Sequence, residues 1–125
     1  MFFFNENEIF INILVPIKFM GESIQYLKLD NSALIKCRIS SKLPVEISWL
    51  KGEEKSNILF SSDSNYEQKP DGLFIKRVSK LDDDTFWCQA DVVDTGESKA
   101  YPIRVIPSRK WNSIISSIIQ RKMKN

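Results

Sequence analysis

Histidine is absent from this chain of 125 residues. Its absence excludes Ser-His-Asp and Cys-His catalysis, histidine-ligated metals and a histidine pH switch. Two cysteines are too few for a four-cysteine zinc site or an iron–sulfur cluster, and the four glycines form no phosphate-binding loop. No stretch approaches the roughly 18 uninterrupted apolar residues of a transmembrane helix. We therefore expect a non-enzymatic protein with no catalytic residues, no cofactor and no metal.

Opposite charges nearly balance, with 18 Lys and Arg against 16 Asp and Glu. A nucleic-acid-binding domain usually has an isoelectric point above about 9, whereas here it is about 8.5, so nucleic acid is not an expected partner. Residues 107–125 hold five bases and no acid, which leaves 13 bases and 16 acids in the rest. We divide the chain into an N-terminal extension (1–12), one domain (13–106) and a basic tail (107–125).

The two cysteines, Cys37 and Cys88, have 50 residues between them. This spacing alone leaves open two unrelated thiols or one long-range disulfide. Apolar residues alternate around each cysteine, which predicts a half-buried strand at both. The residues that share these apolar faces are Ala33, Ile35 and Ile39 for the first cysteine, and Phe86, Ala90 and Val92 for the second. Each cysteine thus lies mid-strand on an apolar face, as a bridge between two sheets requires.

Further short strands with turn signals follow the same pattern. Alternation predicts a strand over 46–51, a strand after the Pro70–Gly72 turn, and a hairpin turn over 94–97 that leads into a strand over 100–105. Proline cannot donate to a ladder, so Pro102 assigns this last strand to a sheet edge or a bulge, and Pro16 assigns a first strand over 13–19 to an edge. The Cys…Trp…Cys spacing with many short strands predicts an all-β, immunoglobulin-like sandwich of two sheets. Its expected core residues are Ile35, Trp49, Leu73, Ile75 and Phe86.

The framework of Cys37, Trp49, Leu73-x-Ile75-x-x-Val78 and Asp82-x-Asp84-x-Phe86-x-Cys88 resembles an intermediate-set immunoglobulin domain. Residues 40–49 and 92–97 are similar to the second immunoglobulin domain of the fasciclin II and neural cell adhesion family. The resemblance covers about residues 13–106. It implies a Cys37–Cys88 disulfide and an extracellular or cell-surface module of a longer membrane-anchored receptor. It also implies like-to-like protein contact in cell adhesion and axon guidance.

The chain departs from the family pattern at three positions. Phe86 stands where a tyrosine is usual, and Asp84 where a glycine is usual. The family pattern implies an arginine partner for Asp82 near the start of the fourth strand, yet no arginine lies between Arg38 and Arg77. The partner of Asp82 is therefore an open question for the structure.

Four residues of one sheet, Lys51, Trp87, Gln89 and Arg104, are expected to point outward and form a protein-binding face. The alternative is that Trp87 is covered by the N-terminal segment or only caps the sheet. On the opposite sheet, Lys36, Arg38 and Lys76 predict a modest patch for heparan-type polyanions, or else scattered surface lysines. The run Asp82–Asp84 lacks EF-hand spacing, and we do not expect it to bind calcium.

The two ends of the chain differ in character from the domain between them. Residues 1–12 carry Glu6 and Glu8 without a base, which argues against a secretory signal peptide. In the tail an apolar stripe at helical spacing predicts a short amphipathic helix, formed by Trp111, Ile114, Ile115, Ile118 and Ile119. Three interpretations of this tail are open. It contacts an anionic membrane, it docks on a neighbour or frays, or it is non-native sequence. The alternative function is accordingly a small secreted or surface-associated protein whose basic tail binds membrane.

Overall fold

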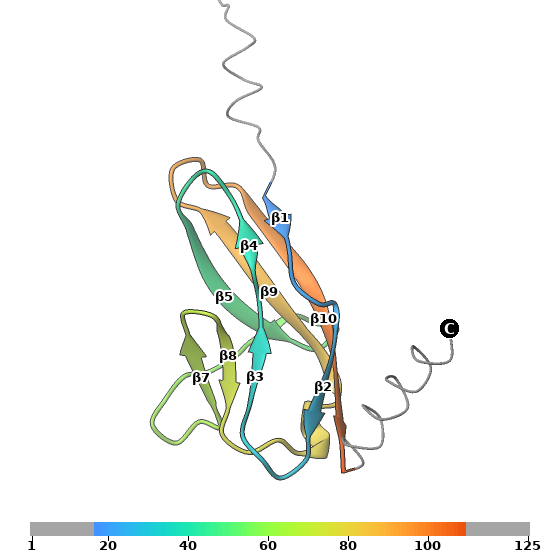
Figure 1. Cartoon of the computed structure of the whole chain (residues 1–125). Coiled ribbons are helices and arrows are strands. Elements are labelled where there is room, and N and C mark those ends of the chain that lie inside the picture. The colour runs from blue at the N-terminus through green and yellow to red at the C-terminus, as the bar shows by residue number, and fades with distance from the viewer. Residues whose placement is uncertain (1–16, 110–125) are drawn as a thin grey trace, which may run out of the picture.

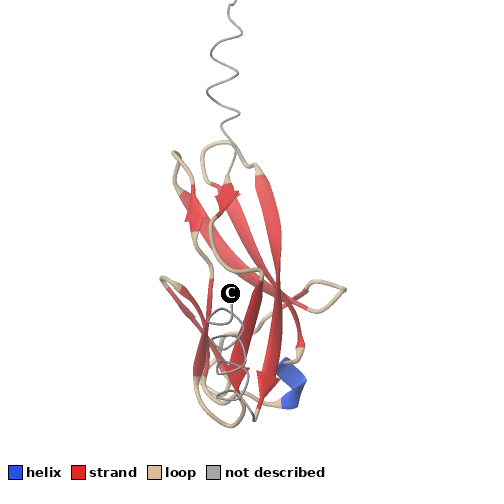
Figure 2. Cartoon of the chain, turned by 45° about the vertical axis from the view of Figure 1, so that its right-hand side comes forward, coloured by secondary structure: helices blue, strands red, loops and turns tan. Residues whose placement is uncertain are grey.

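The computed structural model describes residues 17–109, which form short strands and a single helical turn. The elements are β1 (Lys18–Phe19), β2 (Ile24–Lys28), β3 (Ala33–Lys36), β4 (Ile39–Ser40), β5 (Val45–Lys51), β6 (Ser56–Asn57), β7 (Tyr66–Lys69), β8 (Gly72–Ile75), the 3₁₀ turn η1 (Lys80–Asp82), β9 (Asp84–Val92) and β10 (Ser98–Ser108). Apart from η1, Figure 2 shows only strands and loops among the described residues.

The strands form two layers. One layer is a five-stranded sheet in the order β2-β10-β9-β5-β6, and the other holds the sheet β3-β8-β7 and the pair β1-β4 (Figure 1). A disulfide joins Cys37, between β3 and β4, to Cys88 on β9, with Cα atoms 6.4 Å apart. The prediction of an all-β, immunoglobulin-like sandwich with one inter-sheet disulfide is confirmed.

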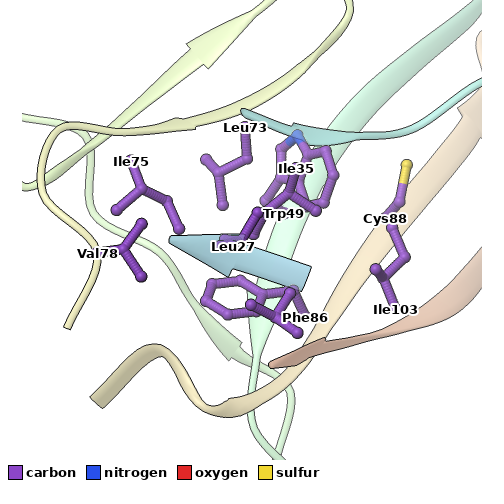
Figure 3. Close-up of a cluster of buried hydrophobic side chains, with 10 residues drawn as sticks. Leu27, Ile35, Trp49, Leu73, Ile75, Val78, Phe86, Cys88 and Ile103 are labelled. Carbon is purple, nitrogen blue, oxygen red and sulfur yellow. The ribbon is translucent and has the colours of Figure 1, made fainter. Parts of the chain in front are cut away.

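The core lies between the layers (Figure 3), and it includes Cys88, while Cys37 packs against it. Ile35, Leu73, Ile75 and Phe86 are 0 % exposed and Trp49 is 2 % exposed. Each side chain of this kind contributes about 1.5–3 kcal/mol when it is removed from water. Alternation in β9 is strict, since every second residue from Phe86 to Val92 is buried. The two apolar faces are therefore joined both by packing and by a covalent bond.

Glycine is required where β8 begins. A Cβ built on Gly72 would lie 2.1 Å from the backbone oxygen of Ile35. No real side chain fits at that distance, so only glycine lets β8 pair with β3 directly after the Pro70–Gly72 turn.

One predicted strand needs correction, and one observed strand was not predicted. The strand expected over 33–39 is interrupted, because Cys37 and Arg38 separate β3 from β4 and the Cys37 N–H bonds to the Asp71 carbonyl at 3.4 Å. β2 was not predicted at all. Of the first predicted strand, only the part from Ile17 onward lies within the described residues, where β1 pairs with β4.

The strand with Pro102 is neither an edge nor bulged. β10 lies between β9 and β2, and its register with β9 is continuous. The Arg104 N–H bonds to Ser23 at 2.7 Å, and β2 pairs with β10 only from Arg104 onward. Backbone nitrogens two residues apart in a strand point to the same side, so Pro102 faces this side just before the pairing starts. Its missing N–H therefore removes no ladder hydrogen bond.

Candidate protein-binding face

The outer face of the five-stranded sheet carries three of the four residues expected there. On β9, Trp87 lies between Leu50 of β5 and Pro102 of β10, while Gln89 lies between Ser48 and Ala100. Arg104 is opposite Thr85 on the same face. Pro102 and Ala100 were not predicted as part of this face. Counting outward from the predicted 94–97 hairpin would pair Trp87 with Arg104, two residues away from the observed partner, so the sequence did not give this register.

Lys51 does not belong to this face, and its predicted outward placement is wrong. It is opposite Phe86 in the register and two residues after the buried Trp49, which puts its side chain on the inner side. Its Nζ donates to the Tyr66 hydroxyl at 3.1 Å and lies 5.5 Å from the centre of the Phe86 ring. Alternation with a period of two, which predicts that Trp49 points inward, also predicts that Lys51 points inward.

Asp82 finds its partners in Lys51 and Tyr66 instead of an arginine. Its side chain is buried, accepts hydrogen bonds from the Tyr66 hydroxyl and from the Ser79 N–H (2.8 Å), and lies 3.8 Å from Lys51 Nζ. A buried carboxylate is stable only when donors and an opposite charge compensate for the lost water. Burial, followed by the hydrogen bond to Asp82, raises the pKa of Tyr66, which therefore stays a donor.

Trp87 is fastened to the turn between β5 and β6. Its Nε1 donates to the Gly52 carbonyl at 2.8 Å, and Lys55 Nζ lies 4.4 Å from the centre of its ring. Gly52 and Lys55 both have positive φ, at 85° and 54°, so the turn is tightly shaped. Trp87 therefore has a structural role in holding this turn, while its half-buried ring still forms part of the outer face.

Charges of opposite sign lie at the two ends of this face. At one end Glu46 and Asp91 are cross-strand neighbours, and Gln89 Nε2 bonds to Asp91 at 3.2 Å. At the other end Arg104 pairs with Asp83 and keeps 45 % of its side chain exposed. The two ends are six residues apart along β10, from the partner of Asp91 to Arg104, or about 20 Å.

Of the other charged candidates, Lys36 and Arg38 line one surface hollow, but Lys76 lies apart from them. Lys36 is opposite Gly72, whereas Lys76 lies four residues further along the chain, about 13 Å away, with its Nζ near the Ser62 carbonyl at 3.4 Å. The polyanion patch stays a prediction. In the run 82–84, Asp82 is buried and Asp83 pairs with Arg104, so these acids diverge. Within residues 17–109 no group of three or more His, Cys, Asp or Glu is placed to hold a metal ion.

The predicted membrane-binding stripe of the tail lies outside the described residues and stays a prediction. In the part of the chain from 17 to 109, no helix has the length and apolar character needed to cross a membrane.

Comparisons with known proteins agree with this geometry. The family model of the immunoglobulin I-set domain matches residues 23–101. Fasciclin-2 of Schistocerca americana is 36% identical over 81 residues, which are 65% of this chain and 9% of that protein. The chain therefore spans a small part of this curated relative.

Solved structures share the fold. The four N-terminal immunoglobulin domains of Dscam1 isoform 6.9 match at 27% identity with a TM-score of 0.57, over 74% of this chain and 25% of theirs. Immunoglobulin domains 1–4 of Sidekick-1 match at 21% identity with a TM-score of 0.59, over 74% and 24%. With the sandwich, the disulfide and the buried Trp49 in place, the chain belongs to the immunoglobulin I-set family.

Proposed function

We propose that this domain is an extracellular adhesion module that binds a second copy of itself through the outer face of its five-stranded sheet. The opposite charges at the two ends of this face carry the proposal. A two-fold axis in the plane of the interface and perpendicular to the strands brings Glu46 and Asp91 of one copy against Arg104 of the other. Such an isologous contact is closed, and it brings the two carboxylates of one copy to the exposed part of Arg104 of the other, which Asp83 contacts within its own copy.

The middle of the face suits protein contact. Trp87 and Pro102 lie side by side next to the apolar Leu50 and Ala100, and the polar residues Gln89, Thr85 and Arg104 border this apolar surface. Aromatic and arginine side chains are enriched at interface hot spots. A standard interface needs about 800 Å² per partner, which is roughly a tenth of the accessible surface of 8579 Å².

An extracellular setting is supported by the disulfide, since such bonds persist in oxidising compartments. The likeness to Fasciclin-2 supports a role in contact between cells. The narrower expectation of axon guidance stays a prediction. The proposed mechanism is binding by a rigid surface and includes no catalytic step.

Sedimentation velocity of the purified domain over a concentration series tests the proposal. We expect a monomer–dimer equilibrium that Gln89→Arg weakens at least about tenfold, because two-fold symmetry brings like charges together at the centre of the face. Leu59→Arg is the matched control, because Leu59 is 79% exposed and lies in the loop after β6, outside the strands β5, β9 and β10 that carry the face.

Two results would contradict the proposal. One is a domain that stays monomeric at the highest soluble concentration, and the other is a Gln89→Arg variant that dimerises like the unchanged chain. Equal weakening by both arginine variants would place the contact elsewhere.

A further inference from the structure

Glu46 and Lys55 are charged side chains at opposite ends of the outer face of the five-stranded sheet. Glu46 lies near the start of β5, where it is exposed and opposite Asp91. Lys55 lies in the turn after β5, is exposed, and has its Nζ 4.4 Å from the centre of the Trp87 ring. Within residues 17–109, neither Glu46 nor Lys55 forms an ion pair. Both charges are therefore available to a partner.

The turn between β5 and β6 brings Lys55 over the sheet. The Gly52 carbonyl accepts hydrogen bonds from Trp87 Nε1 at 2.8 Å and from the Lys55 N–H at 3.1 Å. These two bonds fix the turn against β9, so the ammonium group lies on the side of the sheet that carries Trp87. Because a cation over an exposed aromatic ring is held only weakly, the same ammonium group can contact a carboxylate of a second molecule.

The turn also carries two acids, Glu53 and Glu54. Both are exposed, and neither forms a hydrogen bond or an ion pair with another residue of the described range 17–109. Lys55 is thus the charged side chain of this turn that contacts Trp87 on the outer face.

The two-fold axis of the proposed dimer determines which residues face each other. An axis in the interface plane and perpendicular to the strands reverses the strands and lays β5 on β5 and β9 on β9. The row of Glu46 and Asp91 in one copy then lies over the row of Gly52 and Thr85 in the other. Glu46 therefore faces the turn from which Lys55 extends.

Arg104 by itself does not balance the two carboxylates that reach it. It already pairs with Asp83 in its own copy. It also lies on β10, two strands and about 10 Å from β5. Asp91 on the neighbouring strand β9 is the nearer acid for Arg104, whereas Glu46 is nearer to the turn.

We infer that Lys55 of one copy pairs with Glu46 of the other, and that this pair selects the partner of the outer face. The inference rests on the proposed function, since it needs the same dimer. Two-fold symmetry forms the pair twice, once at each end of the interface. A partner of this face must carry a carboxylate where Glu46 stands, because a cation at that place would repel Lys55.

Charge reversal at each position, followed by mixing of the two variants, tests the pair. Lys55→Glu puts like charges at both ends of its own dimer, and so does Glu46→Lys. In sedimentation velocity at low ionic strength, we expect each variant alone to dimerise at least about tenfold more weakly than the unchanged chain. A mixture of the two variants forms a heterodimer with opposite charges at both ends, and its dissociation constant returns to within about threefold of that of the unchanged chain.

Lys76→Glu is the matched control. It changes the net charge as Lys55→Glu does, but Lys76 is exposed and follows the last residue of β8, in the other layer of the sandwich. We expect Lys76→Glu to leave the dissociation constant within about twofold of that of the unchanged chain. Its mixture with Lys55→Glu does not restore dimerisation. Recovery in the mixture of Lys55→Glu and Glu46→Lys also shows that both variants are folded.

The outcomes separate this inference from the proposed function. If Lys55→Glu dimerises as well as the unchanged chain, the pair is overturned and the proposed dimer stands. The pair is also overturned if the mixture of reversed charges does not recover, or if Lys76→Glu weakens the dimer as much as Lys55→Glu does. An unchanged chain that stays monomeric at the highest soluble concentration overturns both.

Discussion

Replacing Tyr66 by phenylalanine removes the phenolic donor of the buried Asp82 and keeps the ring in place. The ring packs against Phe86 with centroids 6.1 Å apart, and phenylalanine preserves that contact. The Asp82 side chain is 1% exposed, so no bulk water replaces the lost donor. Hydrogen bonds to charged groups contribute about 1.5–3 kcal/mol, and we expect Tyr66→Phe to lower the free energy of unfolding by this amount.

Tyr101 provides the matched control. Its hydroxyl donates to the neutral carbonyl of Ile17 at 2.8 Å, and its ring stacks on Phe19 with centroids 5.3 Å apart. Tyr101→Phe removes the same atom from a comparable aromatic pair but breaks a neutral hydrogen bond, at a cost of about 0.5–1.5 kcal/mol. The difference between the two variants therefore isolates the charge of Asp82.

Urea denaturation followed by tryptophan fluorescence measures both variants. The slope of the free energy of unfolding against urea concentration should stay constant between the variants. In thermal denaturation, an additional loss of about 1 kcal/mol lowers the melting temperature by about 4–8 °C for a domain of this size. If Tyr66→Phe costs no more than Tyr101→Phe, Asp82 does not depend on the hydroxyl and the reasoning fails. Lys51→Met gives a further check, since loss of its ammonium group 3.8 Å from Asp82 also destabilises the fold.

Three further predictions concern pH, the disulfide and the sheet edges. Because the pKa of Tyr66 is raised in the folded state, its contribution is fully present below the unfolded pKa of about 10 and is lost as pH rises above it. Denaturation between about pH 8 and 11 should show this fall, and Tyr66→Phe should flatten it. Cys37→Ala/Cys88→Ala should lose about 2–5 kcal/mol, as should reduction by dithiothreitol, and an unchanged midpoint would refute this. Gln25 bonds to the backbone N and O of Lys36, both at 2.9 Å. Gln25→Leu should cost about 1–2 kcal/mol and speed exchange of the Lys36 amide, and equal exchange rates would count against it.

Much of the fold was predictable from alternation alone. The strands around Trp49, Leu73 and Cys88 have one buried face, and a period of two marks that face in the sequence. Strand β2 was missed because it is an edge strand with only Leu27 buried, so its alternation marks no continuous apolar face. The edge assignment of Pro102 failed because the order of strands within a sheet is a long-range property that local pattern does not encode.

The candidate face also has features that the local sequence pattern predicts and features that depend on long-range packing. Trp87, Gln89 and Arg104 follow from their places in the strands, and applying the same period of two to Lys51 would have placed it inward. Nothing local indicates that Lys55 lies over the ring of Trp87, because that contact depends on how the β5–β6 turn folds over β9. The Asp82 partners were equally hidden, because Lys51 and Tyr66 are 31 and 16 residues away in the chain.

The sequence by itself determined the immunoglobulin class of this chain and its two opposed apolar faces, because alternation is a local property and the Cys–Trp–Cys spacing can be counted along the chain. The absence of histidine also narrowed the chemistry open to the protein, since composition alone decides it. Only the tertiary structure decided that Lys51 and Tyr66 stabilise a buried carboxylate and that Trp87 secures a turn. These features depend on how separate strands pack, and packing brings together residues whose sequence neighbours carry no sign of it.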